Sequence, residues 1–337
     1  MRLATRQSRV TAWVAVISVL VIGGILLSGC APASQEPAGG PGSGVGARPA
    51  PSQGPAVPEG EAEPARAAEK PAGEEAEPAS QAAAAELPPA PPVSTFAPAQ
   101  DLVLQVQFYL EELEEAVATE GEYNDSVDKI VKHSNALILV ALALGLHDTD
   151  NQFKAAAPAM VKAARQLAAA GDYAAAKEGV AALQAATAST EGSPSELKWE
   201  KLASLPALME AVPLINTRLK RYIRDGRETK LKKAVDDLAG QTAALAVIAQ
   251  GSMANSSETD LPNEVGKWLA FCVQMRDAAT DVNARVRAFG QDGTSETFQA
   301  AKTAMKNLAQ SCEDCHALFH PEGETTTEEE EEEETAE

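Results

Sequence analysis

The sequence predicts an all-α protein built as two tandem antiparallel four-helix bundles behind a disordered tether. From Leu102 to Phe319, Ala- and Leu-rich stretches show the three- and four-residue spacing of amphipathic helices. Alternating β-branched residues and the dipeptides of tight hairpins are scarce in this region. Breaker residues divide it into eight helical segments, the number that two four-helix bundles require.

Glycine, proline and short polar residues mark where the predicted helices end. These breakers lie at 119–121, 145–150, 171–172, 192–194, 225–226, 251–262 and 290–293. The breaker at 192–194 is the predicted boundary between a first bundle at 99–192 and a second at 196–321.

The N-terminal segment predicts export and lipid attachment. Basic residues precede an apolar run from Val10 to Leu27, and Leu-Ser-Gly-Cys follows at 27–30. The basic and apolar order is typical of an export signal, and the tetrapeptide matches the lipobox of bacterial lipoproteins. We therefore predict a signal peptide at 1–29 and diacylation of Cys30, which would anchor the protein to a bacterial membrane facing the periplasm or exterior. The alternative, an uncleaved membrane-spanning helix, also leaves the remainder outside the cytoplasm.

Two segments are predicted to be disordered. The segment 30–98 is dominated by Pro, Ala, Gly, Glu and Ser, with hardly any large apolar residue to offset the entropy of ordering. The acidic tail at 322–337 contains the run Glu328–Glu334, which is typical of a solvated charge block. The net charge of -21 and the missing basic stripe give no support for nucleic-acid binding, whereas a basic or neutral protein partner remains open.

An internal repeat relates the two predicted bundles. Tyr173–Leu183 matches Phe298–Leu308 at a constant shift of 125 (298 − 173), without a gap. Val127–Ala141 matches Val235–Ala249 at a shift of 108 (235 − 127), so the second half has an insertion between these helices that increases the shift by 17 (125 − 108). We interpret the halves as duplicated sibling bundles; the alternative is chance similarity between Ala-rich amphipathic helices.

The last predicted helix contains the run Cys312-Glu313-Asp314-Cys315-His316. Both cysteines continue a stripe of apolar residues at alternating steps of three and four, which faces the core. His316 follows Cys315 directly and lies one turn on from Cys312, so the three side chains project over one region of the helix. The stripe consists of Phe298, Ala301, Met305, Leu308, Cys312, Cys315 and Phe319.

Cys-x-x-Cys-His is the attachment motif of c-type haem, in which two thiols add to the porphyrin vinyl groups and the imidazole becomes the proximal iron ligand. We predict one haem c per chain, held by Cys312, Cys315 and His316. The predicted export agrees, because haem attachment takes place outside the bacterial cytoplasm.

The motif has three other interpretations. A thioredoxin-like redox pair is expected near a βαβ unit, which the sequence does not predict. A zinc site would need ligands from Cys272, His320, His133 or His147, with no second cysteine pair to supply them. The cysteines could also pack as small core residues. Once Cys30 is set aside, three cysteines remain, which does not describe a paired disulfide framework.

The motif at the end of a four-helix bundle resembles the class II cytochromes c, meaning cytochrome c prime and its low-spin relatives, over roughly Leu202 to Phe319. The family commonly reads Cys-x-x-Cys-His-x-x-Phe-Arg; Phe319 matches, and His320 stands where Arg is usual. The resemblance places Met209 where low-spin members have a distal thioether ligand to the iron, although the usual preceding Arg-Gln is missing. An apolar residue there leaves the iron of cytochrome c prime five-coordinate.

The first bundle is predicted to be a degenerate, haem-free copy. At the shift of 125, the motif cysteines and histidine correspond to Thr187, Thr190 and Glu191. Val103 falls near the place of Met209, so the distal ligand is missing as well. Among the other candidates, Cys272 is expected to be a buried small hydrophobe, and His133 and His147 are expected to be surface or capping residues.

These features predict a lipid-anchored monohaem cytochrome for extracytoplasmic electron transfer, with redox proteins as partners and no enzymatic activity of its own. Two alternatives stay open. A five-coordinate haem could bind small gases such as nitric oxide, or the haem-free bundle could dock a partner as a surface interaction module. The sequence also leaves open whether bundles pair between chains as a homodimer.

Overall fold

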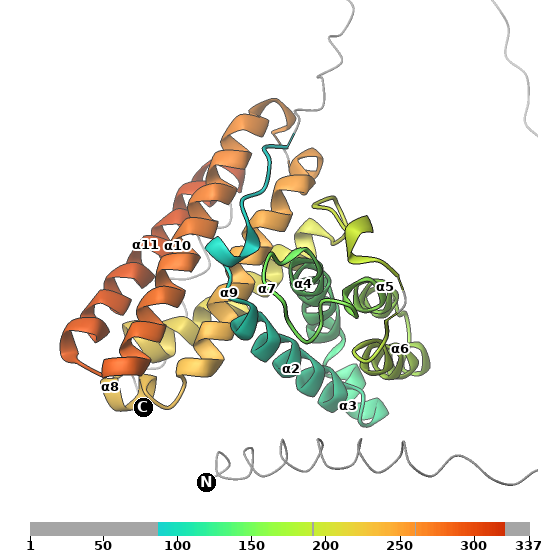
Figure 1. Cartoon of the computed structure of the whole chain (residues 1–337). Helices are drawn as coiled ribbons and strands as arrows, with labels where there is room; N and C mark the ends of the chain where they lie inside the picture. Colours follow the sequence, from blue (N-terminus) through green and yellow to red (C-terminus); the bar gives the residue numbers. More distant parts are fainter. Residues whose placement is uncertain (1–86, 191, 260, 321–337) are drawn as a thin grey trace, which may run out of the picture. The chain divides into compact units, whose positions relative to one another are not determined.

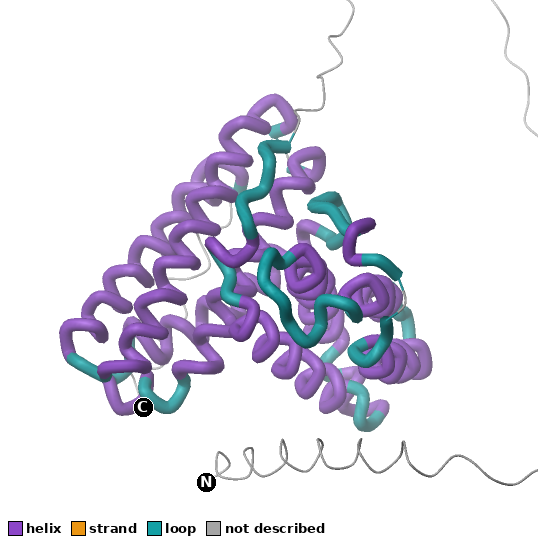
Figure 2. Tube along the Cα trace, in the orientation of Figure 1, coloured by secondary structure: helices purple, strands orange, loops and turns teal. Residues whose placement is uncertain are grey.

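The computed structural model describes residues 87–190, 192–259 and 261–320, which contain ten α-helices and no strand (Figures 1 and 2). The predicted all-α class is therefore confirmed. Eight of these helices have 12 or more residues, in agreement with the eight predicted segments. The predicted signal peptide at 1–29, Cys30, most of the tether and the tail at 322–337 lie outside the described residues.

The first half of the described chain consists of α2 (Ala99–Ala116), α3 (Glu120–Asn124), α4 (Val127–Leu146), α5 (Ala157–Ala168) and α6 (Tyr173–Ala186). The second half consists of α7 (Leu205–Leu219), α8 (Glu228–Leu231), α9 (Val235–Ser252), α10 (Val265–Asp292) and α11 (Ser295–Phe319). A π-helical turn, η3 (Lys220–Arg224), extends α7.

Polar caps and glycine set several of the helix boundaries. The Asp172 carboxylate accepts a hydrogen bond from the Ala175 N–H at 2.8 Å, and the Thr119 hydroxyl accepts one from the Glu122 N–H at 3.1 Å, so α6 and α3 both begin on a capped N-terminus. Gly293 ends α10 in the left-handed conformation with φ 62°, which a side chain would disfavour. The breakers at these places act as the sequence predicts.

The helix boundaries follow the internal repeat. The long helices α4 and α9 begin at Val127 and Val235, which are related by the shift of 108 (235 − 127). The short helices before them, α3 and α8, begin at Glu120 and Glu228, and the shift is the same (228 − 120). Matched core positions in α4 and α9, such as Leu137 and Leu245, are fully buried in both helices.

The insertion in the second half lies in α10. Helices α5 and α10 begin at Ala157 and Val265, which keep the shift of 108 (265 − 157), but α5 has 12 residues and α10 has 28. The shift of 125 therefore applies only after α10, to α6 and α11. Because the insertion lengthens a helix, it leaves the order of the four long helices unchanged in each half.

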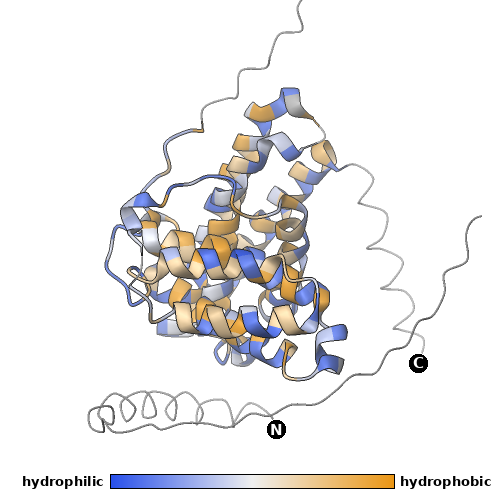
Figure 3. Ribbon diagram, turned by 90° about the vertical axis from the view of Figure 1, so that its right-hand side faces the viewer, coloured by the Kyte–Doolittle hydropathy of each residue, from blue (hydrophilic) through white to orange (hydrophobic). Residues whose placement is uncertain are grey.

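The two halves share one hydrophobic core. Helix α2 packs against both α4 and α9, and α7 also contacts both of these helices; Figure 1 shows α4 between α7 and α5. One cluster of buried apolar residues includes members from all eight long helices, and Figure 3 shows the apolar segments running along them. The predicted separation into two tandem bundles is therefore not confirmed, because both quartets of helices contribute to the same core.

Helix α4 lies at the centre of this core. Its residues from Ala136 to Leu144 are all buried. Among the described helices it is the one with the length and apolar composition to cross a membrane, and 78% of its apolar window is buried inside the protein.

A buried polar network joins α2 to the second half of the chain. The Asp101 carboxylate on α2 is fully buried and accepts hydrogen bonds from Arg287 and, at 2.9 Å, from Asn283 Nδ2, both on α10. Asn283 Nδ2 also donates to the Ala239 carbonyl on α9 at 2.9 Å. This network fixes the register of α2 against α9 and α10.

The tether prediction for 30–98 is wrong at its C-terminal end. Val93, Phe96 and Ala97 are buried, and Val93–Thr95 forms a turn of 3-10 helix. The Phe96 carbonyl accepts a hydrogen bond from the Thr280 hydroxyl on α10 at 3.1 Å. The two large apolar residues of this segment, Val93 and Phe96, pack into the protein and bury it. The prediction missed them because it was based on the average composition of the whole tether.

Candidate functional site

The predicted attachment motif lies in the last turns of α11, on the C-terminal side of the apolar stripe. Cys312 and Cys315 are half-buried and neither forms a disulfide. His316 is exposed, and its ring lies 6.1 Å from the ring of His320 in an edge-on arrangement. The helix closes with a hydrogen bond of 2.8 Å from the His320 N–H to the His316 carbonyl.

A second, smaller apolar cluster surrounds this end of α11. We call it the aromatic cluster; its buried members are Leu205, Met253, Trp268, Cys272 and Phe319. The rings of Trp268 and Phe319 meet edge to face, with centroids 5.5 Å apart. Cys315 and Met209 both pack against the aromatic cluster, one from α11 and the other from α7. The structure thus brings the predicted distal residue and one attachment cysteine to the same apolar cluster.

Asn216 on α7 is a site residue that the sequence did not reveal. Its side-chain Nδ2 lies 3.9 Å from Cys312 Sγ and donates a hydrogen bond to the sulfur, while its buried Oδ1 has no hydrogen-bond partner among the described residues. Asn216 follows Met209 by seven residues, so both side chains lie on one face of α7. That spacing was visible in the sequence, but only the contact of the Asn216 side chain with Cys312 shows that Asn216 belongs to the site.

Burial keeps the cysteines of this region protonated. It raises the pKa of Cys315 to about 11, and Cys312 beside it adds to the shift. Burial also raises the pKa of Cys312, against the opposing hydrogen bond from Asn216, and raises that of Cys272. A catalytic redox pair needs a thiol whose pKa is lowered. The thioredoxin-like interpretation therefore has no support from the surroundings of these thiols.

The remaining alternatives can also be compared with the structure. In the described part of the chain, no three His, Cys, Asp or Glu side chains lie close enough together to hold a metal ion by themselves, so the zinc interpretation finds no preformed ligand set there. Cys272 is buried in the aromatic cluster, as predicted for a small hydrophobe. Two further methionines lie in the apolar regions: Met253 belongs to the aromatic cluster and Met275 packs against the main core.

The donor set and its surroundings fit covalent haem attachment. Two free thiols lie on the same face of one helix, an apolar cluster of aromatic and aliphatic side chains adjoins Cys315, and an exposed imidazole follows directly in the chain. In the first half, Thr187 caps the C-terminus of α6, and Glu191 lies outside the described residues.

The two histidines of the first half are not surface residues. His147 follows α4 as its C-cap residue, as predicted, but it is 2% exposed because its Nε2 lies 3.0 Å from the Ala97 carbonyl. His133 is 8% exposed, between Phe108 and Tyr109 on α2. The prediction of surface or capping residues is therefore confirmed for His147, which caps α4, and wrong for His133, which is buried and caps no helix.

The position that corresponds to Met209 in the first half is also clearer in the structure. The shift of 108 leads from Met209 to Asp101 (209 − 108), two residues before Val103. Asp101 holds Arg287 and Asn283 in the buried network described above. The first half therefore has a structural carboxylate, and no thioether, at this position.

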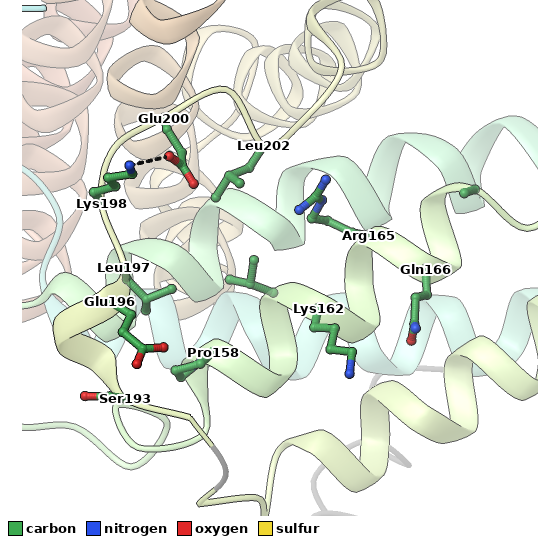
Figure 4. Close-up of a pocket in the computed structure, with 12 residues that line it drawn as sticks. Pro158, Lys162, Arg165, Gln166, Ser193, Glu196, Leu197, Lys198, Glu200 and Leu202 are labelled. Atoms are coloured by element: carbon green, nitrogen blue, oxygen red, sulfur yellow. Dashed lines mark ion pairs between the residues drawn. The ribbon is translucent and has the colours of Figure 1, made fainter.

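One hollow in the described part of the protein lies away from the motif. It has a volume of about 590 Å³ and runs between α5 and the segment 193–202 (Figure 4). Lys162 and Arg165 line its α5 side, and on the other side Lys198 and Glu200 form an ion pair at 3.1 Å. None of the predicted haem residues lines it.

Comparison with known proteins gives no relative from which a function could be transferred. No family model, curated protein or solved structure matches the chain.

Proposed function

We propose that this protein is a lipid-anchored, monohaem c-type cytochrome that transfers electrons outside the cytoplasm. The observation that carries the proposal is the motif on α11: Cys312 and Cys315 are free and half-buried, Cys315 packs against the aromatic cluster, and His316 follows them. The anchor at Cys30 belongs to the same proposal.

Each residue of the site has a distinct role in this proposal. Cys312 and Cys315 would hold the haem through two thioether bonds, and His316 would supply an imidazole ligand to its iron. The bound haem supplies a one-electron iron couple. Asn216 donates a hydrogen bond toward Cys312 Sγ and so orients that side chain on α11.

The aromatic cluster gives Cys315 an apolar surrounding. Trp268 and Phe319 are 5% and 9% exposed, and the Trp268 indole N–H donates to the Ser252 carbonyl at 2.9 Å, which fixes the ring. An apolar, rigid surrounding of this kind is one of the means by which a protein sets the reduction potential of a haem.

The acidic surface around the motif suits electron exchange with a positively charged protein partner. Glu313 and Asp314 are exposed on α11 between the two cysteines, and Gln274 and Gln310 hold the Asp314 carboxylate at 3.3 and 2.8 Å. Complementary charge steers association between proteins. We therefore propose that the redox partner presents a basic face to this end of α11.

Met209 decides between electron transfer and gas binding. Met209 would supply a thioether ligand to the iron of a bound haem if the protein is an electron carrier, whereas a haem held by His316 alone would leave the iron free to bind a small gas. Met209 packs against the same aromatic cluster as Cys315, which favours the first role.

The test is expression of the full-length chain in a host competent for c-type maturation, followed by detection of haem after denaturation. The wild type is expected to retain haem, and the double variant Cys312→Ser, Cys315→Ser is expected to lose it. Cys272→Ala is the matched control, because Cys272 contributes a third thiol beside Cys315. Haem lost equally from the control and the double variant would contradict the proposal.

Absorption and resonance Raman spectra then test the role of Met209. The wild type is expected to be low-spin, and Met209→Leu is expected to become high-spin with covalent haem retained. A wild-type spectrum that is already five-coordinate would overturn distal ligation by Met209 and would favour gas binding.

A further inference from the structure

A second cavity lies where the two quartets of helices meet. Its volume is about 180 Å³, and it is lined by residues of α2, α4, α7 and α9. None of the predicted haem residues lines this cavity. It is therefore separate from the attachment site and belongs to the interface between the two halves.

The cavity collects buried polar atoms that have no partner. In the described part of the chain, seven buried side-chain nitrogen or oxygen atoms lack a hydrogen bond. Four of them belong to residues that line this one cavity, but the Gln105 side chain acts on the Tyr109 hydroxyl as a hydrogen-bond partner. His133 Nδ1 and Gln241 Oε1 are therefore the two groups left without any partner. Buried polar groups in folded proteins are nearly always paired, so these two groups indicate that something polar occupies the cavity.

The repeat supplies two of these groups from equivalent positions. Gln241 on α9 corresponds to His133 on α4 at the shift of 108 (241 − 133) that relates the two helices. Both residues are more than nine-tenths buried, at 2% and 8% exposure. The two central helices of the core therefore each contribute one polar side chain to the same cavity.

The charges at the cavity favour an anion. Lys129 is paired with Glu112 at 3.2 Å, so these two lining residues balance each other. Arg218 also lines the cavity; its guanidinium lies 4.9 Å from the centre of the Phe108 ring, and among the described residues no carboxylate forms an ion pair with it. Burial lowers the pKa of His133 to about 4, so this ring is neutral at physiological pH. One uncompensated positive charge remains.

The size of the cavity limits the ligand. A water molecule takes about 30 Å³ in the liquid, so about 180 Å³ corresponds to roughly six waters. A haem is far too large for it, whereas a carboxylate with a short carbon chain fits. Arg218 and the Tyr109 hydroxyl can donate to such a ligand, and Gln241 Oε1 can accept from a donor on it.

We propose that this cavity binds a small 2-hydroxy monocarboxylate, whose carboxylate pairs with Arg218 and Tyr109 and whose hydroxyl donates to Gln241. This ligand would bridge α2, α7 and α9 and would stabilise the packing of the two halves. Binding does not depend on haem, so the inference stands or falls separately from the proposed cytochrome function.

Isothermal titration calorimetry of the full-length chain in detergent, at constant ionic strength, tests the proposal with lactate and glycolate as probes. Both are expected to bind with one site per chain, and acetamide, a neutral molecule of similar size, is expected not to bind. Arg218→Gln is expected to weaken binding at least tenfold. Arg285→Gln is the matched control, because Arg285 is exposed and pairs with Asp281 on the surface of α10.

Lactate binding is also measured for Tyr109→Phe and Gln241→Leu. Circular dichroism spectra establish that each variant is folded. Each is expected to weaken lactate binding at least fivefold without changing the helix content. The proposal is overturned if neither probe binds, if acetamide binds as tightly as lactate, or if Arg285→Gln weakens binding as much as Arg218→Gln. A crystal structure grown with lactate that has only ordered water in the cavity would also overturn it.

Discussion

The buried imidazole of His133 makes the stability of the protein depend on pH in a calculable way. Burial lowers its pKa to about 4, and the cations of Lys129, Arg218 and Lys132 add to this shift against the opposing charge of Glu112. The ordinary value, 6.5, applies to the unfolded chain. As the pH falls, the unfolded chain therefore binds this proton first, and the free energy of unfolding decreases between about pH 6.5 and pH 4.

The size of the effect follows from the two pKa values. Each unit of difference corresponds to about 1.4 kcal/mol. Between about pH 7 and pH 4.5, titration of His133 alone is expected to lower the free energy of unfolding by about 2 kcal/mol. Above about pH 7 the imidazole is neutral in both states, and its contribution no longer changes.

Urea denaturation followed by circular dichroism at several pH values measures this effect. Other groups titrate over the same range, so the quantity of interest is the difference between the wild type and His133→Gln, which places at position 133 the residue found at the equivalent position 241. The wild type is expected to lose about 2 kcal/mol more than the variant between about pH 7 and pH 4.5. Parallel pH profiles for the two proteins would refute the assignment of a lowered pKa to His133.

Two further predictions concern the packing of the helices. Asp101→Asn removes the buried counter-ion of Arg287 and is expected to lower the free energy of unfolding, measured by urea denaturation, by about 3 kcal/mol. The control Asp236→Asn removes the exposed partner of the same arginine and is expected to lower it by less than about 1 kcal/mol. Equal losses for the two variants would contradict the buried network. Gly293→Ala places a side chain at φ 62° and is expected to lower the thermal midpoint by an amount equivalent to about 1 kcal/mol, whereas Gly171→Ala, at a position with open space, is expected to change it little.

The helices could be predicted from the sequence because their signals are local. Gly293 and Asp172 mark helix ends through the conformation and hydrogen bonding of single residues. The repeat also related the helices of the second half to those of the first. The starts of α3 and α8, of α4 and α9, and of α5 and α10 all differ by the shift of 108.

The packing of the halves on each other could not be predicted in the same way. Asp101 and Arg287 are 186 residues apart (287 − 101), and neither has a local signal that announces the pair. The contacts of α2 with α9 and of α7 with α4 join elements from different halves, while the repeat pattern shows only which residues are buried. The buried position of His133 follows from these contacts and was missed for the same reason.

The candidate site was accessible to sequence analysis only in part. Cys312, Cys315 and His316 form a contiguous motif, so their chemistry can be recognised from spacing alone. Asn216 lies 96 residues before Cys312 (312 − 216) and enters the site through the contact of α7 with α11. The cavity between the halves has no motif, because its polar residues come from four helices.

The central claim is that the motif on α11 attaches one haem covalently. Intact-protein mass spectrometry of the full-length chain, produced with c-type maturation and measured after denaturation, tests it most directly. The account predicts a mass increase of one haem per chain, located by proteolysis on the peptide that contains Cys312 and Cys315. A chain without added haem, or with two haems, would contradict it.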